Sequence, residues 1–157
     1  MEPCYTVTMK RSVFIIVVLA LGAGLLYTQF NTHSTSANSL FIPPLIDSRE
    51  VETIELSLQN TKHEFYPGVM SQTSGFSQSY LGPTIRLYKD EDTRIRFTNE
   101  LGEDTTVHGH GLHVPGEVDG GPQNSIAPGE TWDITLPIRQ QASMSWYHPH
   151  LHGKTAK

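Results

Sequence analysis

The chain has 157 residues, enough for about one domain of ordinary size. Its 13 glycines and 10 prolines favour a fold with many turns and short strands over a helix bundle. The formal net charge of −5, without a run of Lys or Arg, excludes a nucleic-acid partner bound through its phosphates. The single cysteine, Cys4, excludes an internal disulfide framework and a CxxC site for zinc or an iron–sulfur cluster.

The N-terminal segment has the layout of an export signal. Lys10 and Arg11 precede the apolar run Val13–Leu26. As a helix this run reaches about 21 Å, short of the ~30 Å hydrocarbon core of a bilayer, and such a short apolar core behind a basic flank is typical of a secretory signal. We expect a signal peptide or an uncleaved signal-anchor helix at residues 1–37 and a linker at 38–50. The protein would then lie in the periplasm or elsewhere outside the cytoplasm, and contact the membrane only through this segment.

The rest of the chain alternates between apolar and polar residues, which predicts short, half-buried strands. Several such strands separated by turn residues indicate an all-β sandwich or barrel, and no helix is expected after residue 40. A long loop is expected from Val114 to Gly129. The same-side positions of the five predicted strands are Ile54, Leu56 and Leu58; Ile85 and Leu87; Ile95 and Phe97; Trp132, Ile134 and Leu136; and Met144, Trp146 and His148.

Eight histidines stand out, and four of them form two His-x-His pairs, His108/His110 and His148/His150. On an extended chain, residues i and i+2 point to the same side, so each pair aims two imidazoles into one volume. Pro149 supports the extended conformation, because proline is excluded from a helix interior. The two pairs therefore predict a metal site.

The other histidines are weaker candidates. His33 and His63 are expected to be ordinary surface or core residues. His113 breaks the two-residue spacing of its neighbours, whereas His152 shares the spacing of His148 and His150.

An all-imidazole set suits copper, zinc, iron or nickel, and affinity alone does not choose among them. A zinc hydrolase of the metallo-β-lactamase kind needs an aspartate where this chain has Leu112. A cupin needs a glutamate where it has Val114 or Pro115. A histidine-only copper cluster is contradicted by nothing in the two pairs.

The two histidine-containing segments, Val107–Gln123 and Trp146–Thr155, resemble the first two copper-binding motifs of the multicopper oxidases. The similarity is greatest to the bacterial copper-efflux (cuprous) oxidases and their three-domain relatives. Gly109 stands where the family often has an aromatic residue.

Leu81–Arg86 and Asn99 also resemble the opening of the family's first cupredoxin domain. The resemblance implies a cupredoxin-like Greek-key β-sandwich, of which residues 51–157 would form the front part. We expect this domain to be truncated and its sandwich to be incomplete.

The resemblance also assigns roles to single residues. It implies that His108 is a ligand of the type 2 copper, and that His110, His148 and His150 serve the type 3 copper pair. Asp119 resembles an acidic residue that delivers protons near this trinuclear cluster, although it equally fits a turn residue. One subgroup of the family has lost its copper ligands and serves as a cell-division scaffold, and the four matching histidines argue against that subgroup.

The implied function is that of an exported copper oxidase. In the family, a type 1 copper takes electrons from a reducing substrate, here Cu(I) or a phenol-like compound, and the trinuclear cluster reduces dioxygen to water. The type 1 site needs a cysteine and would lie outside this chain. We expect the chain to be the N-terminal fragment of such an enzyme, inactive alone, with further cupredoxin domains completing the cluster. The alternative is a stand-alone periplasmic copper-binding protein without catalysis.

Overall fold

The computed structural model describes residues 40–154. The chain divides into two units, residues 1–41 and 42–157, and the eight strands of the described part all lie in the second. The expected signal or anchor segment, residues 1–37, lies outside the described residues. No described residue lies in a helix, so none belongs to a helix that could span a membrane. The expectation of an all-β chain is confirmed for this part.

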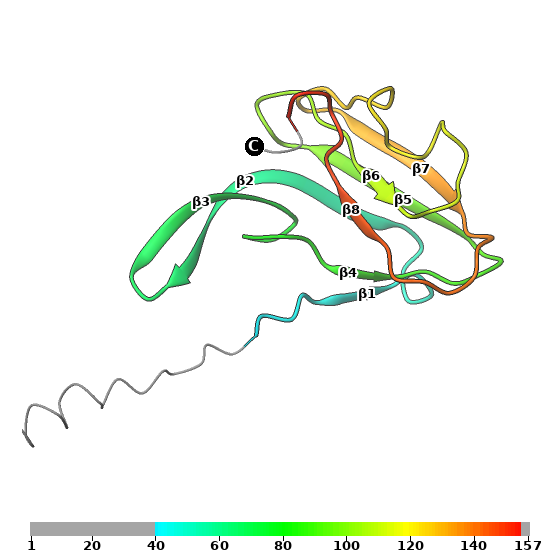
Figure 1. Cartoon of the computed structure of the whole chain (residues 1–157), viewed down its shortest axis with the longest axis horizontal. Helices are drawn as coiled ribbons and strands as arrows, with labels where there is room; N and C mark the ends of the chain where they lie inside the picture. Colours follow the sequence, from blue (N-terminus) through cyan, green and yellow to red (C-terminus); the bar gives the residue numbers. More distant parts are fainter. Residues whose placement is uncertain (1–39, 155–157) are drawn as a thin grey trace, which may run out of the picture. The chain divides into compact units, whose positions relative to one another are not determined.

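The strands form three separate sheets (Figure 1). A four-stranded sheet has the order β3-β2-β5-β7, with β2 parallel to β5 and the other neighbours antiparallel. Strands β1 and β4 form a parallel pair, and β6 and β8 form an antiparallel pair. The bounds are β1 Leu45–Asp47, β2 Ile54–Tyr66, β3 Val69–Phe76, β4 Thr84–Arg86, β5 Asp92–Asn99, β6 His108–His110, β7 Thr131–Pro137 and β8 Trp146–His148.

The core lies on one face of the four-stranded sheet. Ile54 of β2, Ile95 of β5 and Ile134 of β7 are in register across three strands and are at most 8% exposed. Full burial of such a side chain stabilises the fold by roughly 1.5–3 kcal/mol. The two short sheets cover this face, since Ile46 of β1 and Tyr147 of β8 pack against the core. The alternation in the sequence therefore predicts β2, β5 and β7 correctly.

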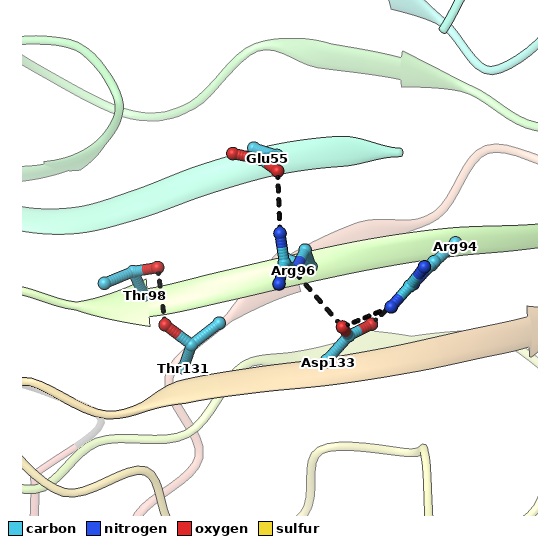
Figure 2. A network of polar contacts seen from close by, with 6 residues as sticks. All are labelled: Glu55, Arg94, Arg96, Thr98, Thr131 and Asp133. Atoms are coloured by element: carbon cyan, nitrogen blue, oxygen red, sulfur yellow. Dashed lines mark hydrogen bonds and ion pairs between the residues drawn. The ribbon is translucent and has the colours of Figure 1, made fainter. Parts of the chain in front are cut away.

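The opposite face of the same sheet is polar and open to solvent (Figure 2). Arg94 donates to both carboxylate oxygens of Asp133, at 2.9 and 2.7 Å. Arg96 donates to Asp133 and to Glu55, each at 3.1 Å, and so links β5 to both of its neighbours. These side chains lie at the alternate strand positions that face solvent, because successive residues of a strand point to opposite faces of the sheet.

Two strands appear where the sequence pattern predicts none. β1 lies within the segment 38–50 that is expected to be a linker, and it pairs with β4 through Ile46 and Ile85. β3 pairs with the C-terminal half of β2 in a two-stranded ribbon that is largely exposed on both faces. Its polar residues show no alternation because neither face is buried. Met144, placed by the sequence in the last strand, lies outside β8 and is fully exposed.

Candidate metal centre

The site is built by the antiparallel pair β6 and β8. Their register places His108 opposite His148 and His110 opposite Trp146. His108 and His110 point to one side of β6 because they are two residues apart on an extended chain. The pairing of these two short strands thus joins histidines that lie 38 residues apart in the sequence, His110 and His148.

Three of the four predicted ligands converge. Ring nitrogens of His108, His110 and His148 all lie within 4.8 Å of one another. Nδ1 of His110 is 3.3 Å from Nε2 of His148. Two nitrogens bound to one ion at about 2 Å lie at most roughly 4 Å apart, so small ring rotations suffice for a shared ion. The donor set therefore fits a metal that prefers imidazole, copper among them.

His150, the fourth predicted ligand, lies beside this group. Its ring centroid is 5.1 Å from that of His108 and 5.8 Å from that of His148. It follows Pro149 and lies outside β8. Its backbone N–H donates to Oγ1 of Thr106, 2.7 Å away, just upstream of β6.

Two of the imidazoles have a fixed tautomer. Nδ1 of His108 is 2.9 Å from the backbone oxygen of Asp119, and Nδ1 of His148 is 2.8 Å from that of Pro149. A carbonyl oxygen only accepts, so Nδ1 carries the proton in each ring and donates it. The lone pair then lies on Nε2, the arrangement that orients a histidine for metal binding.

The protonation state of His148 also suits a ligand. Burial lowers the pKa of His148, and the neighbouring imidazoles of His108, His150 and His110 lower it further, while the hydrogen bond to the Pro149 carbonyl opposes this. The ring is therefore neutral at neutral pH, as a metal ligand must be.

Asp119 lies in the long loop that the sequence predicts between Val114 and Gly129, and the loop holds it against β6. Its backbone oxygen accepts from the N–H of Gly109 at 3.2 Å as well as from the His108 ring. Its carboxylate Oδ2 is 3.4 Å from Nδ1 of His108. Gly120 makes this approach possible, because a Cβ at this position would collide with the carbonyl oxygen of Val107.

Trp146 contacts two of the converging histidines, a role that the sequence does not predict although it places this residue in a strand and at the start of the second histidine-containing segment. Its indole stacks on His148 with centroids 4.1 Å apart and on His110 with centroids 4.8 Å apart, with interplanar angles of 23° and 24°. Only the register of β6 and β8 shows that it lies opposite His110. Leu112 fills the space beside Gly109, since a Cβ at 109 would be 2.7 Å from its Cδ1.

The weaker histidine candidates do not join the group. His113 is exposed, and its backbone N–H donates to the side chain of Gln140. His63 is half-buried on β2, and its Nδ1 is 2.9 Å from the hydroxyl of Ser79. His152 is exposed and is not one of the converging histidines among residues 40–154. His33 lies outside the described residues.

Several known proteins are similar in sequence to this part of the chain. The family model described as "Multicopper oxidase" matches residues 57–157. The multicopper oxidase mco of Staphylococcus aureus is 39% identical over 79% of the chain, and the cell division protein FtsP of Yersinia pestis is 37% identical over 88% of it. The chain spans 29% of the length of each of these relatives.

Solved structures agree with the sequence relatives. The laccase-like multicopper oxidase CueO from Ochrobactrum sp. is 43% identical and superposes with a TM-score of 0.71, over 74% of this chain and 26% of that one. McoA multicopper oxidase from Aquifex aeolicus is 29% identical with a TM-score of 0.68, over the same shares. The matched region is part of a cupredoxin domain, and the chain belongs to the multicopper oxidase family.

Proposed function

We propose that the chain supplies half of the ligands of a trinuclear copper cluster in an exported multicopper oxidase. His108 would bind the type 2 copper, and His110, His148 and His150 would bind the type 3 pair. The observation that carries this proposal is the convergence of three imidazole nitrogens within 4.8 Å in a chain of this family. The ring of His150, 5.1 Å from that of His108, supports its inclusion as the fourth ligand.

Copper bound at such a cluster supplies one-electron chemistry that couples oxidation of a reducing substrate, Cu(I) or a phenol-like compound, to reduction of dioxygen to water. The chain's own residues would orient the histidine ligands of the cluster. Nδ1–H donation from His108 and His148 to backbone carbonyls fixes the direction of both Nε2 lone pairs. The Asp119 carboxylate, whose Oδ2 is 3.4 Å from Nδ1 of His108, would be the group that passes protons toward the cluster.

The remaining cluster ligands and the type 1 site would come from further cupredoxin domains. Cys4 is the only cysteine of the chain and lies before the apolar N-terminal run, which makes it unsuited to a type 1 site. The chain by itself would therefore bind copper without oxidising a substrate. The run Val13–Leu26 behind Lys10 and Arg11 supports export, with the folded part outside the cytoplasm.

A second candidate is a stand-alone copper-binding protein without catalysis. The observation that favours it is that the three-nitrogen group of His108, His110 and His148 forms within this chain alone. Both candidates require copper. A role in cell division, as in the name of FtsP, gives no reason for the converging histidines.

Copper titration of the full chain tests the proposal. Cu(II) added against a competing chelator should bind saturably, and His108→Ala and His148→Ala should each weaken binding at least tenfold. His113→Ala is the matched control and should bind like the wild type, because this exposed histidine lies outside the group. A wild-type chain that binds no Cu(II), or one whose binding survives both ligand substitutions, would overturn the assignment.

Oxygen uptake separates the two candidates. Under both candidates, the full chain with copper and either Cu(I) or a phenol should consume oxygen no faster than the same mixture without protein. A longer product of the same gene, carrying further cupredoxin domains, should consume oxygen with these substrates under the oxidase proposal. If such a product binds copper and remains inactive, the oxidase proposal is wrong and copper binding without catalysis holds instead.

A further inference from the structure

The hydroxyl of Thr106 links the two histidine motifs at the point where their strand pairing ends. Thr106 is completely buried, and its Oγ1 accepts the backbone N–H of His150 at 2.7 Å. No motif in the sequence marks this residue, which lies two positions before His108.

The register of β6 and β8 explains why a side chain makes this link. In the antiparallel pairing His108 lies opposite His148, so two residues further along, Thr106 and His150 would be the next partners on the same side. However, β6 begins at His108 and β8 ends at His148, so neither strand includes this pair. Pro149 has no N–H and so cannot donate to a ladder beyond His148. The Thr106 hydroxyl takes the role of a backbone acceptor for the next residue.

We infer that Thr106 is a positioning residue for His150. This inference rests on the proposed copper-binding function. The hydrogen bond to the backbone N–H of His150 fixes the position from which its side chain extends. The His150 ring centroid then lies 5.1 Å from that of His108 and 5.8 Å from that of His148. Without the hydroxyl, the N–H of His150 loses its buried acceptor, and the segment after Pro149 moves to satisfy it elsewhere.

The neighbouring threonine provides a matched control. Thr105 is also buried, 4% exposed, but its hydroxyl makes only a long contact of 3.4 Å to the backbone oxygen of Thr106. Thr105→Val and Thr106→Val are therefore the same change at adjacent buried positions. Only the second removes the acceptor that His150 uses.

The test is a double-mutant cycle on Cu(II) affinity, measured on the full chain against a competing chelator. Thr106→Val should weaken Cu(II) binding by roughly tenfold, the lower range for loss of a group that orients a ligand. Thr106→Ser should restore wild-type affinity because it keeps the hydroxyl, and Thr105→Val should change it by less than twofold. In a His150→Ala background, Thr106→Val should have no further effect, since its role acts through His150.

A second measurement follows the hydrogen bond without metal. Amide hydrogen exchange at His150 should be faster in Thr106→Val than in the wild type, and unchanged in Thr106→Ser and Thr105→Val. Wild-type affinity in Thr106→Val, an equal loss in the His150→Ala background, or unchanged exchange at His150 would each overturn the positioning role. A wild-type chain that binds no Cu(II) would instead overturn the proposed function on which this role depends.

Discussion

His108 and His148 face each other across β6 and β8, with ring centroids 5.5 Å apart and ring planes at 88°. The two strands have only three residues each, so few backbone contacts set their register. A slip of one residue would turn His148 to the opposite side of its strand and dissolve the group of three nitrogens. The hydrogen bond from the Tyr147 hydroxyl to the Pro83 carbonyl and the bond from the His150 N–H to the Thr106 hydroxyl resist such a slip, because they hold β8 and the residues after it.

Trp146 should report copper binding directly. Its indole stacks on His110 and His148, so Cu(II) held by these rings lies close enough to quench its fluorescence. Trp132 stacks on Phe97 in the four-stranded sheet and serves as the control. Emission measured during Cu(II) titration should fall in Trp132→Phe and stay nearly constant in Trp146→Phe. Equal quenching in both variants would show that the ion binds elsewhere.

Gly120 should tolerate no side chain. Its φ is +76°, and an added Cβ would collide with the carbonyl oxygen of Val107. Gly129 has a similar φ of +79° but nothing within 4 Å of an added Cβ, so it isolates the backbone strain. Gly129→Ala should lower the free energy of unfolding by about 1 kcal/mol, and Gly120→Ala by about 3 kcal/mol or more. Urea unfolding of both variants checks this, and equal losses would mean that the collision is relieved without cost.

Asn99 should be a stability determinant of the fold. It is completely buried, its amide nitrogen donates to the carbonyls of Glu103 and Ile126, and its side-chain oxygen accepts from the N–H of Leu101. Asn99→Ala leaves these groups unpaired and should cost about 3 kcal/mol in urea unfolding. The exposed Asn60 is the control, and Asn60→Ala should cost less than about 0.5 kcal/mol. A loss below about 1 kcal/mol at residue 99 would contradict this account.

The polar face of the main sheet predicts a pH dependence (Figure 2). Hydrogen bonds from Arg94, and more weakly the charge and hydrogen bond of Arg96, lower the pKa of Asp133 below its usual 3.8. A carboxyl whose pKa is lower in the folded chain adds stability above its unfolded pKa and loses it as the pH falls through the folded value. The difference in unfolding free energy between wild type and Asp133→Asn should thus be constant near neutral pH and shrink below about pH 4. A difference independent of pH down to pH 2 would exclude this contribution.

The sequence predicts the parts of the fold that have one buried face. Ile54, Ile95 and Ile134 alternate with polar residues, and all three lie in the core. The ribbon strand β3 escapes detection because exposure on both faces leaves no pattern to read. β1 escapes because its two apolar residues, Leu45 and Ile46, are adjacent and so show no alternation.

The candidate site divides in the same way. The sequence alone predicts that His108 and His110 point to the same side, because they are two residues apart on an extended chain. The contributions of Thr106 and Trp146 depend on which residues of β6 and β8 lie opposite each other. That register is a tertiary property, set by packing and by bonds such as the one from the Tyr147 hydroxyl to the Pro83 carbonyl, and no local pattern encodes it.

The separation of His110 from His148 along the chain sets an order of events during biosynthesis. The ribosome synthesises the segment with His108 and His110 before the segment with His148 and His150. During export the two segments would cross the membrane in the same order. Until β8 docks on β6, the early segment offers at most a two-nitrogen chelate. The three-nitrogen set therefore forms only after β8 has docked on β6, and copper binding at full strength would follow that step.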